Sequence, residues 1–133
     1  MTALRGNGRT VRVGVLGAGA WAEFAHLPGY KRDARCEVVA IADPVVDRAR
    51  VAAAKFAIPT VYVSHEELIA RDDIDVVDVC TPSATHFELS WGALEAGKHV
   101  HGERRGRPPR CRERAQCRWG LARGFNCHCL AGG

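Results

Sequence analysis

The sequence contains no run of 18 apolar residues, and its first ten residues lack the apolar segment of a secretory signal. We therefore expect a chain that neither spans a membrane nor is secreted, and a cytoplasmic location. Val, Ile and Met are missing from residues 102–133, although residues 1–101 contain 14 Val. The residue types that build a core thus stop near His101. At 133 residues the chain has the length of one domain.

The charge changes at the same point. Residues 1–101 carry 11 Lys or Arg against 13 acids, whereas residues 102–133 carry 8 Arg against 2 acids. We predict a flexible N-terminus over residues 1–9, one folded domain over residues 10–101, and an irregular Arg- and Cys-rich tail over residues 102–133.

The stretch from Val11 to Ala22 reads VRVGVLGAGAWA, an apolar run of strand character that ends in a G-x-G-x-x-A motif. Gly17 permits a tight turn, Gly19 lets the backbone approach a pyrophosphate, and Ala22 allows close packing of helix on strand. Ordinary strand-to-helix turns also collect small residues, so the motif indicates a nucleotide site only if an acidic residue ends the next strand.

The next apolar run ends in Asp43, 21 residues after Ala22, and the dinucleotide-binding fingerprint has an acid at about this distance. A carboxylate there accepts the hydroxyl groups of an adenosine ribose and repels a 2′-phosphate. Pro44 leaves no cation adjacent, so NAD is favoured over NADP, and Arg48, one helical turn on, is the residue that can reverse this preference. The alternative is a solvated carboxylate that caps the next helix.

Strand and helix patterns alternate along the rest of the domain, which predicts a Rossmann-like α/β fold with a doubly wound parallel sheet. We expect the strand order 3-2-1-4-5 and a ligand crevice at the carboxyl ends of the first and fourth strands. Four of the expected strands end near residues 16, 43, 63 and 80, and a fifth starts at residues 98–101. The expected helices cover residues 21–26, a short segment from Pro28, 46–56, 64–70 and 85–96.

Several polar residues have structural interpretations. Asp78 interrupts the fourth strand, and a buried carboxylate is usually paired, so we expect a structural rather than a catalytic role. Ser64 and Glu67 predict a capping box at the start of the third main helix, with His65 on its solvated surface. We expect His26 and His99 to fill helix and strand positions without binding a ligand. The role of His101 is left open.

Short motifs then succeed one another in a fixed order, and together they resemble the nucleotide domain of the glucose-fructose oxidoreductase and inositol dehydrogenase (Gfo/Idh/MocA) family over residues 10–103. They are GAGxxA at 17–22, His26-Leu27-Pro28, Ala42-Asp43, Glu66-Glu67-Leu68, Asp75-Val76-Val77, Thr81-Pro82 with His86, and AGKHV at 96–100.

This resemblance implies hydride transfer between NAD(P) and a carbinol carbon of a sugar, polyol or related small molecule. It also implies roles for single residues. Gly17, Gly19 and Trp21 would lie on the pyrophosphate and Asp43 on the adenosine ribose. The remaining contacts implied with the cofactor, along the fourth strand end and near the nicotinamide ribose, are Thr81, Pro82, His86 and Glu103.

One departure from the family concerns the step after AGKHV, where the family has Glu-Lys-Pro and this chain has Glu103-Arg104. The family's Lys handles a proton during hydride transfer, and an Arg cannot release its proton at working pH. No residue here matches the catalytic His of the family's second domain, so we assign no catalytic residue. We expect nucleotide binding without turnover, and self-association through an open sheet edge.

The tail from residue 102 onward is composed mainly of Arg, Gly, Pro, Cys and Ala, as expected of GC-rich coding DNA read out of frame, and we interpret it as a disordered frame-shift product. The alternative is a non-catalytic nucleic-acid-binding chain, because Arg105-Gly106-Arg107-Pro108 resembles the core of an AT-hook. We favour the first interpretation. The spacing of the tail's potential metal ligands lacks paired C-x-x-C loops, so we predict no metal site from Cys111, Cys117, Cys127, His128 and Cys129.

Overall fold

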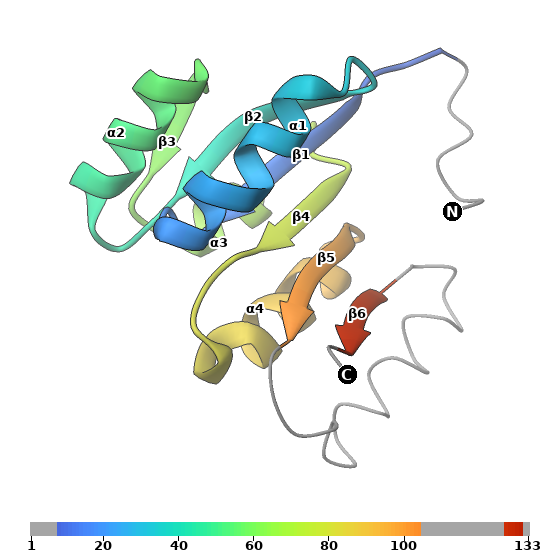
Figure 1. Cartoon of the computed structure of the whole chain (residues 1–133). Helices are drawn as coiled ribbons and strands as arrows, with labels where there is room; N and C mark the ends of the chain where they lie inside the picture. Colours follow the sequence, from blue (N-terminus) through green and yellow to red (C-terminus); the bar gives the residue numbers. More distant parts are fainter. Residues whose placement is uncertain (1–7, 105–126, 132–133) are drawn as a thin grey trace.

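The computed structural model describes residues 8–104 and 127–131, in which strands and helices alternate (Figure 1). The strands are β1 (Val11–Leu16), β2 (Cys36–Ala42), β3 (Thr60–Tyr62), β4 (Val76–Val79), β5 (His99–Arg104) and β6 (Cys127–Ala131). The helices are η1 (Ala22–His26), α1 (Leu27–Arg32), α2 (Val46–Phe56), α3 (His65–Ile69) and α4 (Ser83–Glu95).

The strands form one parallel sheet in the order β3-β2-β1-β4-β5-β6. The order of the first five strands is the order that the alternation of patterns predicts, and the Rossmann-like fold class is confirmed. Strand β1 lies between β2 and β4, so the chain crosses to the other half of the sheet after β3. This crossing makes the carboxyl ends of β1 and β4 the switch point at which doubly wound folds bind ligands.

The sheet also contains β6, which lies in the segment for which the sequence predicts no regular structure. Backbone pairing joins residues 127–131 in parallel with residues 100–104 of β5. Strand β5 starts where the sequence predicts and continues to Arg104, three residues past the predicted domain boundary at residue 101. The backbone explains this pairing: an edge strand offers unpaired N–H and C=O groups, and the backbone of a later segment can satisfy them without a recognisable strand pattern in the sequence.

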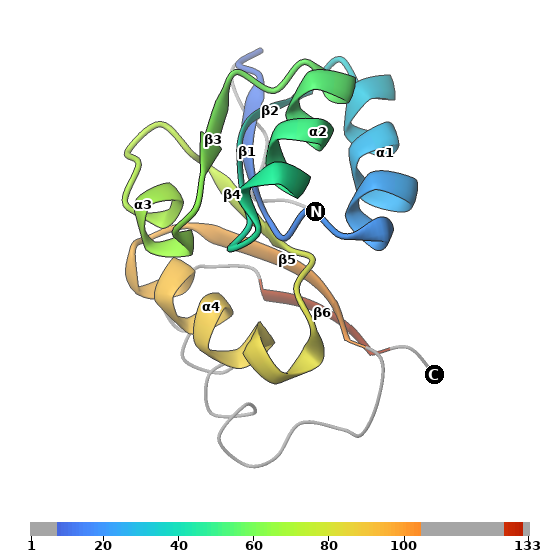
Figure 2. The ribbon, with the colours of Figure 1, turned by 90° about the vertical axis from the view of Figure 1, so that its left-hand side faces the viewer.

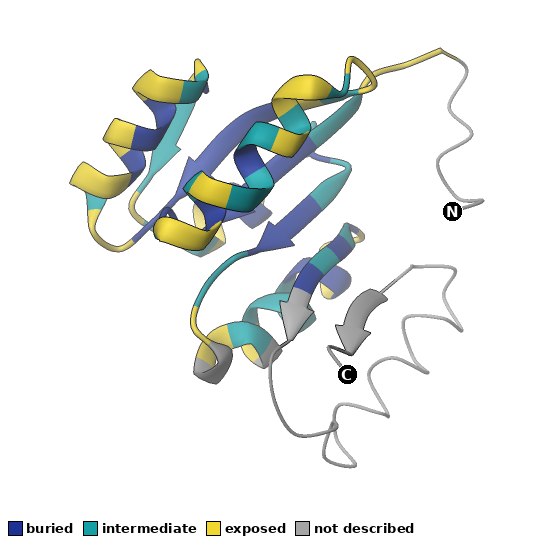
Figure 3. Cartoon of the chain, in the orientation of Figure 1, coloured by how far each residue is buried: buried dark blue, intermediate teal, exposed yellow. Residues whose placement is uncertain are grey.

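Helices cover both faces of the sheet, with α1 and α2 on one face and α3 and α4 on the other (Figure 2). Each face has its own core. Leu27, Ile41 and Ala52 belong to the first core, and Leu68, Val77 and Leu94 belong to the second. The central strands are therefore buried from both sides (Figure 3), which explains their nearly continuous apolar sequence.

Glycine at position 14 lets side chains of the second core pack closely on β1. A Cβ atom there would lie 2.6 Å from Leu68 Cδ2 and 2.9 Å from Ile74 Cδ1, so an alanine would force the ends of these two side chains to shift. At the two helix ends expected from the sequence, the backbone turns left-handed: Ala57 after α2 has a φ of 53°, and Gly97 after α4 has a φ of 80°.

The predicted capping box at α3 is wrong. Ser64 is the N-cap residue, but its hydroxyl donates to Glu66 Oε2 at 2.7 Å instead of bonding a backbone N–H of the helix. A hydrogen bond to a carboxylate is stronger than one between neutral groups, which explains why the hydroxyl takes this partner. This hydrogen bond also lowers the pKa of Glu66.

The amino ends of β1 and β4 are joined by a network of ion pairs. Arg9 Nη2 lies 2.9 Å from Asp75 Oδ1, and the backbone N–H of Arg12 donates to Asp75 Oδ2 at 2.9 Å. Asp73 accepts from Arg71 at 2.6 and 2.8 Å and from Arg12 at 2.9 Å. These contacts fix the end of the sheet opposite the switch point.

Among the described residues, no helix is long and apolar enough to cross a membrane.

Candidate functional site

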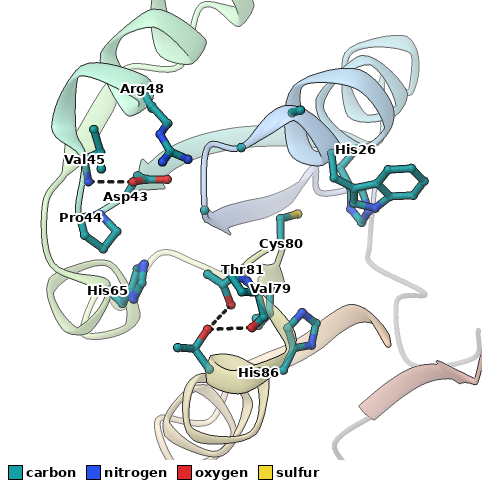
Figure 4. Close-up of a pocket in the computed structure, with 16 residues that line it drawn as sticks. His26, Asp43, Pro44, Val45, Arg48, His65, Val79, Cys80, Thr81 and His86 are labelled. Atoms are coloured by element: carbon teal, nitrogen blue, oxygen red, sulfur yellow. Dashed lines mark hydrogen bonds between the residues drawn. The ribbon is translucent and has the colours of Figure 1, made fainter. Parts of the chain in front are cut away.

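A cleft of about 590 Å³ opens at the carboxyl ends of β1 and β4, where the sequence predicts the ligand crevice (Figure 4). It runs from the loop after β2 to the loop after β4. Its lining residues are Gly17, Gly19, Ala20, Trp21, His26, Asp43, Pro44, Val45, Arg48, His65, Val79, Cys80, Thr81, Pro82, Thr85 and His86. Seven of the eight residues predicted to contact a cofactor are in this set.

The fold requires glycine at one of the two glycine positions in the loop after β1 but not at the other. Gly17 has a φ of 96°, and a Cβ atom there would lie 3.0 Å from the backbone carbon and oxygen of Cys80, so the fold itself requires glycine. Gly19 has no positive φ, and a Cβ atom there would meet nothing within 4 Å. Neither backbone conformation nor packing explains the missing side chain at position 19, which faces the open cleft.

Asp43 lies at the end of β2 and is almost fully buried, with 6% of its surface exposed. Its Oδ2 accepts the Ala18 N–H at 2.8 Å, and its Oδ1 accepts the Val45 N–H at 2.8 Å. The carboxylate therefore ties the glycine loop to the loop before α2 and keeps its charge at the cleft wall. The Val45 bond also satisfies the backbone N–H of the N-cap residue of α2, but the alternative of a solvated capping carboxylate is wrong, because Asp43 is buried.

Arg48 and His65 line the same end of the cleft as Asp43 (Figure 4). The expectation that His65 lies on a solvated helix surface is wrong, because α3 packs its first residue against the cleft. The His65 Nε2 atom is buried, and no hydrogen-bond partner for it exists among the residues that the structure describes. No sequence signal marks this position, since the short helix lacks an amphipathic period.

The loop after β4 and the first turn of α4 form the opposite wall. Thr85 Oγ1 lies 2.9 Å from Thr81 Oγ1 and 2.9 Å from the Pro82 carbonyl oxygen, which holds the loop in place. His86 lies against Gly102 of β5, where a Cβ atom would be 3.3 Å from the His86 ring. Trp21 is 40% exposed at the start of η1.

Asp78 is fully buried in β4 and is paired, as the sequence predicts. Its Oδ2 lies 2.6 Å from His26 Nδ1 and accepts the Tyr30 hydroxyl at 2.7 Å. Burial, and then the charge of Asp78, raise the pKa of Tyr30, so the phenol remains a hydrogen-bond donor. The expectation that His26 only fills a helix position is incomplete, because His26 also lines the cleft.

Two sequence predictions concern side chains that the structure does not describe. Glu103 lies in β5 with its backbone paired to Leu130 of β6, but its side chain is outside the described part, as is that of Arg104. The AT-hook-like segment at 105–108 and the cysteines at 111 and 117 also lie outside the described residues.

The fold and the cleft define an α/β domain of the dinucleotide-binding class. The profile of the oxidoreductase family with an NAD-binding Rossmann fold, Gfo/Idh/MocA, matches residues 11–104. The chain therefore belongs to the Gfo/Idh/MocA family and contains its NAD(P)-binding domain.

The chain is similar to curated and solved proteins of different activity. It is 38% identical over 93 residues to 4-carboxy-2-hydroxymuconate-6-semialdehyde dehydrogenase of Sphingobium sp., covering 70% of this chain and 29% of the relative. It is 34% identical over 94 residues to D-glucoside 3-dehydrogenase of Escherichia coli, covering 71% and 27%.

A 3-ketoreductase from Actinomadura kijaniata, solved in complex with TDP-benzene and NADP, superposes with a TM-score of 0.81 at 33% identity, over 88% of this chain and 37% of that one. The chain thus spans less than a third of the length of the two curated relatives.

Proposed function

We propose that the cleft holds a nicotinamide dinucleotide for an oxidoreductase that moves a hydride to or from a carbinol carbon of a sugar, polyol or related small molecule. The dinucleotide supplies the hydride chemistry when it is bound, and the residues of this chain bind and orient it. The single observation that carries the proposal is Gly19, which lines the cleft and whose missing side chain is required by no contact or backbone angle in the described part of the chain.

In this proposal the pyrophosphate lies over the loop of Gly17, Gly19 and Trp21, at the amino end of η1, where the helix dipole favours an anion. The open space above Gly19 permits the approach of phosphate oxygens to the backbone. Thr81, Pro82 and His86 would contact the cofactor along the end of β4, because they line the opposite wall of the same cleft. Glu103 keeps its proposed place near the nicotinamide ribose.

Asp43 would accept the ribose hydroxyl groups of the adenosine. Its two oxygens each accept one backbone N–H, which leaves further lone pairs for hydroxyl donors. A fixed, nearly buried carboxylate repels a 2′-phosphate, and we propose a preference for NAD over NADP on this ground. Arg48 lines the same end and is the cation that would weaken the preference.

Proton transfer is the step for which this chain offers no family residue, since Arg104 stands where the family has Lys and a guanidinium keeps its proton. We propose that the 133 residues alone bind the dinucleotide without oxidising a substrate. We also propose self-association, since Phe24 of η1 is 82% exposed and β6 is an edge strand.

Calorimetric titration of the purified chain with NADH and with NADPH tests the cofactor proposal. We expect saturable NADH binding with a Kd in the micromolar range or weaker, and weaker binding of NADPH. Replacing Asp43 by Asn removes the repelling charge but keeps an acceptor, so the difference between the two nucleotides should shrink. Equal affinity of the wild type for both nucleotides would contradict the role of Asp43.

A further inference from the structure

Three side chains with metal-binding donors meet on one face of the sheet, beneath η1. His26, Asp78 and His101 each offer one ligand atom, and these atoms all lie within 4.8 Å of one another. They come from three elements, η1, β4 and β5. Among the described residues of the chain this is the group of three or more such side chains that lie close enough to share an ion.

The register of the sheet brings the three together. Asp78 of β4 and His101 of β5 are direct partners in the parallel pairing, so their side chains stand next to each other on one face. His26 ends η1 above that face, with its Nδ1 2.6 Å from Asp78 Oδ2 and its ring centroid 5.7 Å from that of His101. Strand pairing and a helix end thus position the donors without a flexible loop.

The environment favours a cation. The Asp78 side chain is fully buried and that of His26 is 8% exposed, so a carboxylate charge is held away from water. Imidazole nitrogens and a carboxylate oxygen are common ligands of zinc and related divalent transition metals, with metal–ligand bonds of about 2.0–2.2 Å. Ligand atoms around such an ion lie roughly 3.3–3.6 Å apart. The His26–Asp78 pair at 2.6 Å would have to open by about 0.7–1.0 Å, and no pair would have to close by more than about 1.2–1.5 Å to reach this spacing.

We propose that His26, Asp78 and His101 form a binding site for one divalent transition-metal ion of the zinc type. Three protein ligands leave a fourth coordination position for water or another small ligand. Because His26 also lines the cleft, the ion would lie beside the cleft wall, near Cys80, whose Sγ is 3.5 Å from Asp78 Oδ1. The site does not depend on the proposed cofactor, and its binding is measured without nucleotide.

Cobalt(II) titration of the reduced, chelator-treated chain tests the site, because tetrahedral or five-coordinate cobalt gives visible absorption bands. The tail cysteines are replaced by serine in every sample, so that thiolates there do not bind the metal. We expect one equivalent to bind and zinc to displace it. His101→Gln and Asp78→Asn should each weaken binding at least about 100-fold, since the loss of an outer partner alone costs about 10- to 100-fold.

The matched control is His99→Gln, on the same strand and the same face as His101 but outside the cluster. Its cobalt affinity should equal that of the parent. If Asp78→Asn does not fold, as circular dichroism would show, the half-buried His101 variant decides alone. No stoichiometric binding by the parent, or equal binding by the His101 variant, would overturn the proposal and leave a purely hydrogen-bonded His26–Asp78–Tyr30 cluster.

Discussion

Replacing Gly19 by Ala should separate cofactor binding from folding. A Cβ atom at this position meets no heavy atom within 4 Å, and the backbone there has no positive φ, so the folded protein accommodates it without strain. The alanine also restricts the unfolded chain, which stabilises the fold by about 0.4–1 kcal/mol. The same methyl group occupies the space above the glycine loop, where phosphate oxygens would approach.

The expected loss is that of overpacking, which costs about 1–3 kcal/mol for an added carbon in a filled site. Each 1.4 kcal/mol is about tenfold in affinity, so NADH binding should weaken by about 5- to 150-fold. Calorimetry measures the affinity, and thermal denaturation measures the stability. The variant should therefore melt no earlier than the wild type while it binds NADH less tightly.

Gly29→Ala is the matched control. Gly29 lies in α1 away from the cleft, and a Cβ atom there also meets nothing within 4 Å. Its effect on the unfolded chain is the same, and its NADH affinity should stay at the wild-type value. If Gly19→Ala bound NADH as tightly as Gly29→Ala, the pyrophosphate would not lie over Gly19.

Three further predictions concern stability and association. Gly17→Ala should destabilise the fold by about 2–4 kcal/mol, from the left-handed backbone and the 3.0 Å approach to Cys80, and an unchanged urea midpoint would contradict this. Hydrogen bonds from Arg71 hold the pKa of Asp73 below its usual range, so its stabilisation is present above about pH 4 and is lost as the pH falls further. Because the side chain of Asp73 is 40% exposed, this stabilisation should be about 1 kcal/mol or less. The melting temperature of Asp73→Asn should therefore fall less between about pH 5 and pH 3 than that of the wild type. Parallel plots of melting temperature against pH would contradict the pairing. Phe24→Ser removes the most exposed of the large apolar side chains described, so it should reduce self-association. In sedimentation velocity experiments at high concentration, the wild type should show a larger sedimentation coefficient than the variant. Identical sedimentation profiles would argue against self-association through this surface.

The fold could be predicted largely from the sequence because its signals are local. The apolar run before Gly17, the small apolar face of α2 and the stop at Gly97 each depend on residues within one element, and alternation of strands and helices determines the sheet order. The strand at residues 127–131 was not predictable in this way, because its pairing satisfies the backbone of β5 and needs no apolar pattern.

In the site, too, residues with a local sequence signal were predictable and residues that depend on distant contacts were not. The glycine loop and Asp43 have a fixed spacing, so the sequence places them in one cleft. The roles of His26, His65 and His101 depend on contacts between elements far apart in the chain, and a single histidine in a sequence carries no sign of its partner. The capping box failed for a related reason, since a competing carboxylate one residue nearer took the hydroxyl of Ser64.

A crystal structure of the chain grown with saturating NAD would locate the dinucleotide directly. We expect the pyrophosphate over Gly19, within hydrogen-bonding distance of the next backbone N–H groups along the chain, and the adenosine ribose at Asp43. A dinucleotide bound elsewhere, or a cleft without nucleotide at concentrations that saturate binding in solution, would contradict this expectation.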